Sequence, residues 1–327
     1  MRNFTFKGLF LAGLFMVLGC LSIQAADDDG LITKQITIKL EKAGTLPNKI
    51  GSTKKFQITN LKIIGEINGT DLCFIREMAG SDREGWRTEG KLATLDLSGA
   101  KIVRGGGIYY NSVNCYTSDD VIGNYAFSDC SGLTSLILPS NVTSIGYSAF
   151  YGCICLTSLT LPSSVTSIGS SAFEACYGLF SLTLPSSVTE IGESAFRGCC
   201  SLASLTLPSS VTSIGKSAFE GCSGLTSIYV SWESPLSIDA STFKDANTGK
   251  CILYVPKGTY DDYWLSNWGI FENIVEYDAT GIDHITTSGE AKEISRYAAD
   301  GQRLEVPAKG LNIVKYSDGC VKKVVVQ

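Results

Sequence analysis

The stretch Ser144–Thr166 reads SIGYSAFYGCICLTSLTLPSSVT, and the next two blocks of equal length repeat it. Ser167–Thr189 reads SIGSSAFEACYGLFSLTLPSSVT, and Glu190–Thr212 reads EIGESAFRGCCSLASLTLPSSVT. A looser copy, Val121–Thr143, precedes them, and Ser213–Val230 begins a fifth. A fixed period of this length is typical of stacked structural units rather than of one globular core. Because a single unit has no partner for its apolar side, several must stack to bury it.

Each repeat carries one strand pattern. The run Ser158–Leu161 alternates hydroxyl and leucine side chains, as a strand with one buried face does. Pro162 ends this strand, because proline has no N–H for a further ladder bond. Gly146 is expected in a turn, and Ser148–Phe150 is too short for a helix and predicts one helical or 3₁₀ turn. The strands should therefore form one face of the stack and the turns the other.

The shared positions, LxxLxLPxxVxxIGxxAFxxC, resemble the BspA-like family of leucine-rich repeats. The resemblance implies a right-handed leucine-rich-repeat solenoid, with a parallel sheet on one face and short helical or 3₁₀ turns on the other. It also implies export from Gram-negative anaerobes of gut and mouth, and adhesive or protein-binding roles. Two irregular repeats around Leu61 and Leu95, and a last strand around Leu253, bring the expected total to about eight coils.

The pattern divides the chain into four parts. We expect a signal peptide, an N-terminal cap with irregular repeats, the regular repeats with a C-terminal cap, and a linker with a short β tail. Their bounds are 1–25, 26–120, 121–277 and 278–327.

The N-terminus predicts export. Arg2 and Lys7 form a charged start, the run 8–21 is apolar, and Ala25 ends a small-residue cleavage site. The apolar run is too short for a comfortable membrane span. An alternative interpretation is a lipoprotein box at Val17–Cys20, which would leave a lipid anchor on Cys20. Both alternatives predict a protein at the cell surface or outside the cell, as a secreted protein or an outer-membrane lipoprotein.

Both ends of the repeat stack show capping patterns. Ile36–Leu40 alternates and predicts a strand, and Asp71–Met78 predicts a helix that follows capping residues. At the other end, Tyr260, Trp264 and Trp268 recur every fourth residue, which favours one apolar helix face packed on the last coil. The alternative function for these aromatic residues is a sugar platform.

The final residues predict a small β tail. The stretches Gly310–Tyr316 and Val321–Val326 are predicted strands, and 298–303 predicts a hairpin turn. The tail resembles C-terminal β segments of exported proteins from the same bacterial group, including sorting tails of the type IX secretion system. Gln302-Arg303 departs from the Gly-Arg or Arg-Arg that family members often carry, which weakens the sorting interpretation.

Twelve cysteines in an exported chain invite a disulfide interpretation, but their spacing argues against it. One cysteine recurs at the same position of each repeat, so we expect a ladder of small buried hydrophobic side chains with free thiols. Neighbouring coils lie about 4.8 Å apart, within disulfide reach, yet side chains in register have poor torsion for a bridge. The ladder residues are Cys130, Cys153, Cys176, Cys199 and Cys222.

The sequence offers little support for catalysis, for a metal or dinucleotide site, or for nucleic-acid binding. His284 is the only histidine and lies in the expected linker, away from the stacked serines and cysteines that a nucleophilic pair would need. No cysteine pair has zinc-site spacing, and Gly105–Gly107 lacks the strand–turn–helix context of a dinucleotide site. The formal net charge of −5 offers no basic stripe for phosphates. We predict a non-enzymatic protein with no catalytic residue, cofactor or metal.

Two functions remain open from the sequence. The first is protein binding or adhesion, to host matrix or other cells, through large side chains on a nearly uncharged scaffold. The second is a glycan-binding surface module that uses Tyr109, Tyr110, Trp264 or Trp268. Candidate partner-binding residues lie in the insertion Gly105–Asp120, at variable turn positions, and at the ends of the sheet face. They are Tyr109, Tyr110, Ile137, Tyr147, Tyr151, Tyr177, Phe180, Tyr229 and Trp232.

Overall fold

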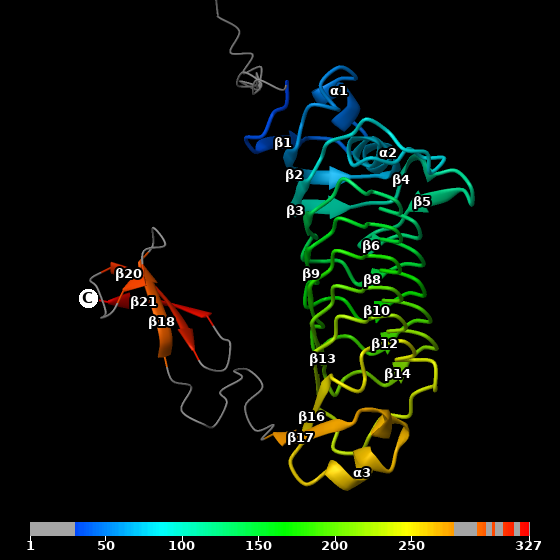
Figure 1. Ribbon diagram of the computed structural model, residues 1–327. Coiled ribbons are helices and arrows are strands. Elements are labelled where there is room, and N and C mark those ends of the chain that lie inside the picture. Colours follow the sequence, from blue (N-terminus) through cyan, green and yellow to red (C-terminus); the bar gives the residue numbers. More distant parts are fainter. Residues whose placement is uncertain (1–29, 278–292, 299–302, 305–309, 317–320, 327) are drawn as a thin grey trace, which may run out of the picture. The chain divides into compact units, whose positions relative to one another are not determined.

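Successive coils contribute one strand each to a ladder of strands (Figure 1). The structure is a computed structural model, and it describes residues 30–277, 293–298, 303–304, 310–316 and 321–326. The predicted signal peptide, Cys20 and His284 lie outside the described residues. The chain divides into two compact units, Met1–Val275 and Glu276–Gln327. The first unit holds the coils, and its ladder consists of two five-stranded sheets.

The strands of this ladder follow the order of the coils. The first sheet has the order β1 (Ile36–Leu40), β2 (Asn60–Ile67), β3 (Thr94–Ile102), β7 (Ser135–Ile137) and β9 (Ser158–Thr160). β11 lies beside β9 and begins the second sheet. That sheet has the order β11 (Ser181–Thr183), β13 (Ser204–Leu207), β15 (Ser227–Val230), β16 (Ile252–Pro256) and β17 (Asn273–Tyr277).

The expected solenoid of parallel strands is confirmed, with a small difference in the count. Five strands in each of two sheets give ten, where about eight coils were expected. The two additional strands are β1 and β17, one at each end of the ladder. In the regular part each leucine pairs with its equivalent one repeat away, as Leu159 does with Leu136 and Leu182 with Leu205.

A column of phenylalanine rings fills the core between the two faces. The rings of Phe150 and Phe173 have centroids 5.0 Å apart and planes inclined by 5°. The next pair, Phe173 and Phe196, repeats this geometry at 5.1 Å and 3°. All these rings are buried. Because the coil spacing of about 4.8 Å is close to the contact distance of stacked rings, every coil buries the face of its neighbour's phenylalanine.

The opposite face differs from the expectation of short helical turns alone. It holds a second parallel sheet of two-residue strands, in the order β14 (Ser213–Ile214), β12 (Glu190–Ile191), β10 (Ser167–Ile168), β8 (Ser144–Ile145) and β6 (Val121–Ile122). The predicted single turn follows each of these strands, as where the Ala149 N–H donates to the Gly146 carbonyl oxygen at 3.3 Å. The turn is not 3₁₀ helix, because Ser148 has a left-handed φ of 49°.

Glycine follows each of these short strands for a reason that the sequence pattern did not reveal. A Cβ on Gly169 would lie 2.7 Å from the carbonyl carbon of Gly146, closer than real Cβ contacts come. Gly169 is not among the glycines with a left-handed φ. The position therefore needs glycine because adjacent coils approach closely there, rather than because the turn demands an unusual backbone angle.

Side-chain hydroxyls also join one coil to the next. The Thr166 hydroxyl donates to the Thr143 carbonyl oxygen at 3.2 Å, and the Ser187 hydroxyl donates to the Val165 carbonyl oxygen at 2.6 Å. Equivalent bonds recur in the neighbouring repeats. The threonine hydroxyl adds a second bond to a carbonyl that already accepts from the Thr166 N–H, and the serine hydroxyl binds the Val165 carbonyl, so the repeated Ser and Thr positions reinforce the contact between coils.

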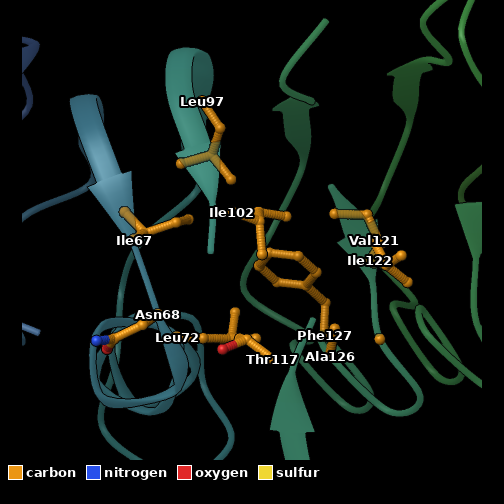
Figure 2. A pocket seen from close by; sticks show the side chains of 11 residues that line it. Ile67, Asn68, Leu72, Leu97, Ile102, Thr117, Val121, Ile122, Ala126 and Phe127 are labelled. Atoms are coloured by element: carbon orange, nitrogen blue, oxygen red, sulfur yellow. The ribbon is translucent and has the colours of Figure 1, made fainter. Parts of the chain in front are cut away.

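The N-terminal cap contains the predicted helix. α2 (Gly69–Met78) begins with a capping box. The Asn68 side chain accepts from the backbone N–H of Asp71, and the Asp71 side chain accepts from the backbone N–H of Asn68. A shorter helix, α1 (Leu46–Ile50), lies against α2, and the Leu46 N–H donates to the Asp71 carboxylate at 2.9 Å. Figure 2 shows an apolar cavity between this cap and the first regular coil. Its volume of about 10 Å³ leaves room for about one water at most.

The C-terminal cap contains two short helices instead of one. α3 (Tyr260–Trp264) and a 3₁₀ helix, η1 (Asn267–Ile270), are separated by Ser266, whose hydroxyl oxygen accepts from the Trp268 N–H at 3.2 Å. The expected apolar face at every fourth residue is therefore wrong. Tyr260 and Trp264 are exposed, while Trp268 packs against the last phenylalanine of the column, Phe243, at 5.5 Å.

The second unit is a four-stranded antiparallel sheet in the order β19 (Arg303–Leu304), β18 (Glu293–Ala298), β20 (Gly310–Tyr316) and β21 (Val321–Val326). The predicted strands Gly310–Tyr316 and Val321–Val326 are confirmed with those bounds. Within the described part of the chain, no helix is long and apolar enough to cross a membrane.

Candidate functional site

Exposed apolar side chains gather on consecutive coils of the regular repeats. Tyr151 is 39% exposed, Tyr177 is 50% exposed and Phe180 is 63% exposed. Ile154 belongs with them at 44%, because it occupies in its repeat the position that Tyr177 occupies in the next. We call Tyr151, Ile154, Tyr177 and Phe180 the aromatic cluster. Sequence reasoning missed Ile154, since an isoleucine within a repeat is indistinguishable from a core residue by type alone.

The backbone of the next coil lies beside this cluster. A Cβ on Gly198 would lie 3.7 Å from the Tyr177 ring, an ordinary contact, so the left-handed φ of 74° rather than space favours glycine there. Partial burial, with a smaller contribution from the Glu174 and Asp129 carboxylates, raises the pKa of Tyr151. Next to it, Arg197 bridges the Glu174 and Glu220 carboxylates at 3.1 and 3.6 Å. The cluster is thus an apolar patch whose adjacent charges are already paired on the surface.

A second row of tyrosines crosses from the insertion to the first repeats. The rings of Tyr110 and Tyr125 stack at 4.7 Å, and the Tyr125 and Tyr147 rings meet edge to face at 5.3 Å. Burial is the main cause that raises the pKa of Tyr125 to about 12. Tyr147, at the end of the row, is 46% exposed. Of the predicted residues, Tyr110 packs within this row and Tyr147 is available to a partner.

Two predicted binding residues are buried, so their assignment was wrong. Tyr109 is 1% exposed and its hydroxyl donates to the Asn124 carbonyl oxygen at 2.9 Å. Trp232 is 8% exposed, and its indole N–H donates to the Val211 carbonyl oxygen at 2.9 Å. Both have a polar atom that a buried backbone acceptor satisfies, which is how large aromatic residues enter a core. Both residues lie outside the regular copies 121–230, so the repeat pattern could not show that they are buried.

The remaining predicted residues lie on the strand face. Ile137 is exposed, at 44%. Tyr229 is half-buried and its ring stacks on that of Tyr254 at 4.4 Å. They lie on β7 and β15, so β9, β11 and β13 separate them in the ladder and they do not form one site.

The predicted insertion is a folded hairpin rather than a spacer. β4 (Gly105–Tyr110) pairs antiparallel with β5 (Cys115–Thr117). Its tip exposes Val113 and Tyr116, each at 56%. The Asn111 N–H donates to the Arg83 carbonyl oxygen at 2.7 Å, so the hairpin is bonded to the loop that follows α2.

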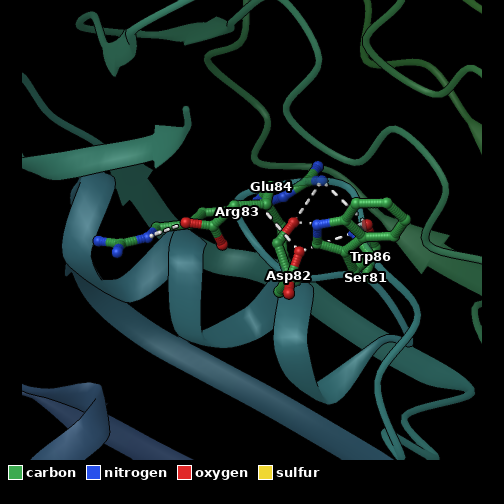
Figure 3. Close-up of polar contacts among 6 residues, drawn as sticks. Ser81, Asp82, Arg83, Glu84 and Trp86 are labelled. Atoms are coloured by element: carbon green, nitrogen blue, oxygen red, sulfur yellow. Dashed lines mark hydrogen bonds and ion pairs between the residues drawn. The ribbon is translucent and has the colours of Figure 1, made fainter. Parts of the chain in front are cut away.

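That loop, 81–87, exposes the side chain of Trp86, which is 74% exposed (Figure 3) and which sequence reasoning missed. The Asp82 carboxylate accepts from the Glu84 N–H at 3.0 Å and from the Trp86 N–H at 2.7 Å. Beneath it, the buried Arg76 guanidinium donates to the Asp82 carbonyl oxygen at 3.0 Å. No periodicity marks this segment, so its only signal was a tryptophan between charged residues.

The cysteine ladder is buried and reduced in the structure. Burial raises the pKa of Cys176 and of Cys222 to about 12, because a thiolate would be desolvated. Cys155 and Cys200, which lie off the ladder, are exposed free thiols. Among the described residues, no group of three or more His, Cys, Asp and Glu side chains could hold a metal ion.

Comparisons with known proteins agree with this architecture. A family model described as a BspA type leucine rich repeat region matches residues 120–249 in six copies. Residues 120–249 are thus similar to BspA-type leucine-rich repeats. Outside the matched residues lie the N-terminal cap with the Trp86 loop, the insertion hairpin and the second unit, so this similarity covers the regular repeats and the aromatic cluster. A search of curated proteins found no match.

Several solved structures are similar to parts of this chain. A leucine rich repeat protein of T. pallidum is 29% identical over 48% of this chain and 62% of that chain, with a TM-score of 0.34. A leucine-rich repeat protein from Bacteroides ovatus is 28% identical over 46% of this chain and 42% of that chain, with a TM-score of 0.36. The pneumococcal vaccine antigen PcpA is 19% identical over 67% of this chain and 57% of that chain, with a TM-score of 0.43. In each case the match spans less than two thirds of the other chain.

Proposed function

We propose that the protein is an exported, non-enzymatic binding module that captures a protein partner at the cell surface, such as host matrix or another cell's surface protein. The observation that carries the proposal is the aromatic cluster, in which four large apolar side chains are exposed on consecutive coils of a rigid stack. Exposed aromatic side chains on a preorganised scaffold lose little conformational entropy on binding and commonly dominate interface energetics.

The surroundings of the cluster favour an apolar contact over an electrostatic one. Of the charges beside it, Glu174, Arg197 and Glu220 pair with one another, and the Asp129 carboxylate accepts from the Ser128 hydroxyl. Binding should therefore change little between low and physiological salt, since few unpaired charges would be screened. The predicted signal segment and the leucine-rich repeats support a location at the cell surface or outside the cell, with a lipid anchor on Cys20 as one form of attachment.

The experiment measures binding of the purified mature protein to immobilised extracellular-matrix proteins by surface plasmon resonance. The variant replaces Tyr151, Ile154 and Tyr177 with serine, and the control replaces the equally exposed Tyr116 with serine. Loss of a single hot-spot side chain costs about 2 kcal/mol or more, so the triple variant should bind at least about thirty-fold more weakly even if only one of the three is a hot spot. Equal binding by parent and triple variant would place the site elsewhere, with the Ser/Thr strand face as the next candidate.

The alternative function, a glycan-binding module, loses part of its sequence support. Of its four platform residues, Tyr109 and Trp268 are buried, so neither can stack on a sugar. Trp264 stays exposed at 49%, but Tyr260 stacks beside it at 6.3 Å within the cap. These residues do not form a platform together with Tyr110, which lies in the row of tyrosines on the N-terminal side of the repeats.

A further inference from the structure

An open groove lies between the segment that leads from α2 to β3 and the first regular coil. Its volume is about 330 Å³. Residues 87–91 form one wall, and Ser131 and Gly132 of the first regular coil form the other. None of the lining residues belongs to the aromatic cluster, so the groove is a separate feature of this chain.

Close packing and hydrogen bonds fix the backbone segments that form the walls of the groove. A Cβ on Gly90 would lie 2.3 Å from the carbonyl oxygens of both Glu77 and Met78, so only glycine fits this approach to the end of α2. The Thr88 hydroxyl donates to the Glu77 carbonyl oxygen at 2.6 Å. On the other wall, the Gly132 N–H donates to the Ala79 carbonyl oxygen at 3.0 Å. The groove is therefore preformed and needs no ordering when a ligand enters.

The side chains that line the groove are polar and available. The side chains of Arg87, Glu89, Lys91 and Ser131 line it, and within the described part of the chain these side chains form no hydrogen bond or ion pair. No apolar side chain lines it. Both charge signs and a hydroxyl are represented, so the groove offers donors and acceptors side by side without a strong net field.

Trp86 is not among the residues that line the groove, but it immediately precedes Arg87, which does. At 74%, its side chain has the largest exposed fraction of any aromatic residue among the described residues. Its backbone is fixed on both sides: the Trp86 N–H donates to the Asp82 carboxylate at 2.7 Å, and the Asp82 N–H donates to the Trp86 carbonyl oxygen at 2.9 Å (Figure 3). An exposed indole on a backbone fixed in this way offers an apolar face to a ligand.

We propose that Trp86 and this groove form a site for a neutral saccharide. A pyranose has an apolar C–H face that fits the indole and a rim of hydroxyls that fit mixed donors and acceptors, and this pair of features is what the site provides. An apolar peptide would find no pocket for its side chains here. A polyanion would meet Glu84 and Glu89 among the basic residues, and the chain as a whole carries a net charge of −5.

The test is a glycan array with neutral and acidic oligosaccharides, probed with the full mature protein and with Trp86→Ala. The oligosaccharide with the strongest signal is then titrated by calorimetry. We expect a neutral saccharide to bind the parent, with at least tenfold weaker binding for Trp86→Ala and for Arg87→Ala. The matched control is Trp264→Ala, which removes an exposed indole from the other end of the stack and should leave the affinity unchanged.

Melting temperatures of the variants establish that the fold is intact, which the exposure of both side chains predicts. The site is overturned if no glycan binds above background, if only acidic glycans bind, or if Trp86→Ala binds as the parent does. A protein ligand that depends on Trp86 while the array stays silent would also overturn it and would make Trp86 a protein contact. The serine variant of the aromatic cluster should keep its glycan binding, which separates this proposal from the protein-binding one.

Discussion

The thiol of Cys176 donates a hydrogen bond to the carbonyl oxygen of Phe150 in the preceding coil, with 3.1 Å between the sulfur and the oxygen. The same bond joins Cys199 to Phe173 at 3.3 Å and Cys222 to Phe196 at 3.2 Å. The ladder cysteines are thus more than small apolar side chains. These thiols add a second hydrogen bond to buried carbonyls that already accept from a backbone N–H next to the phenylalanine column, and only the protonated thiol can donate it.

Native-state alkylation should separate two classes of cysteine. With iodoacetamide at pH 8, Cys155 and Cys200 should react in the folded protein, because both thiols are exposed. Cys153, Cys176 and Cys199 should react only after unfolding, because they are buried and their pKa values are raised. Mass spectrometry of peptides after denaturation without reductant measures this. A disulfide between Cys153 and Cys176 would contradict the thiol ladder.

Stability should fall at alkaline pH because of the same thiols. An unfolded cysteine loses its proton near pH 9.0, while burial holds the pKa of folded Cys176 at about 12. Between these values the unfolded state binds fewer protons than the folded state, so the free energy of unfolding decreases as pH rises. Below pH 9.0 the contribution of Cys176 is fully present and constant.

Each such thiol changes the free energy of unfolding by about 1.4 kcal/mol per pH unit within this window. Urea titrations from pH 8 to pH 11 should show a shallower decline for Cys176→Ala than for the parent. Cys155→Ala, at an exposed site, should decline as steeply as the parent. Identical slopes for the parent and Cys176→Ala would show that the ladder thiol does not resist ionisation.

The phenylalanine column should carry much of the stability. Phe173 is completely buried and stacks on a ring above and a ring below. Phe173→Ala should lower the free energy of unfolding by about 3–5 kcal/mol, because it leaves a cavity between two coils that cannot collapse separately. Chemical denaturation measures the change, with Phe180→Ala as an exposed control that should stay within about 0.5 kcal/mol. An unchanged transition for Phe173→Ala would refute the stacked core.

Arg76 should fix the N-terminal cap to the first repeat. It is completely buried, and its guanidinium donates to the Tyr125 carbonyl oxygen at 2.7 Å and to the Ser81 hydroxyl at 3.1 Å. The Tyr110 ring covers it at 5.0 Å. Arg76→Lys cannot reach all these acceptors, and each buried acceptor left unpaired costs about 1–3 kcal/mol.

Arg76→Lys should therefore unfold at lower denaturant and should exchange the Trp86 amide hydrogen faster, since the loop loses its anchor at Asp82. Arg83→Lys is the matched control, because Arg83 lies exposed in the same loop and pairs with Glu84 on the surface. Hydrogen exchange followed by mass spectrometry measures the loop directly. Unchanged exchange at Trp86 would mean that the loop is held without Arg76.

Much of the fold could be predicted because the repeat imposes one environment on each position. Ile36–Leu40, Gly310–Tyr316 and Val321–Val326 were predicted strands with the bounds that the structure has. The C-terminal cap was harder, since Tyr260, Trp264 and Trp268 matched a helical period that a break at Ser266 interrupts. A period found in three residues did not show where the chain would turn.

Exposure of the candidate site residues could also be predicted for some positions and not for others. Tyr147, Tyr151, Tyr177 and Phe180 were predicted as exposed because they vary at turn positions of a known repeat, and their exposure is confirmed. Tyr109 and Trp232 also vary, yet both are buried because a backbone carbonyl lies within reach of their polar atoms. Such a carbonyl belongs to a distant part of the chain and leaves no trace in the local pattern.

The stack, its phenylalanine column and its cysteine ladder therefore follow from the repeat alone, because a repeated residue must meet its own copy one coil away. Which non-repeated residues face water depends instead on contacts that form only in the folded chain. Trp86 is exposed because Asp82 and Arg76 hold its loop open, and Tyr109 is buried because its hydrogen-bond acceptor, Asn124, lies on the coil that follows the hairpin. Those contacts join residues that no period relates, so the fold had to bring them together before their roles could be assigned.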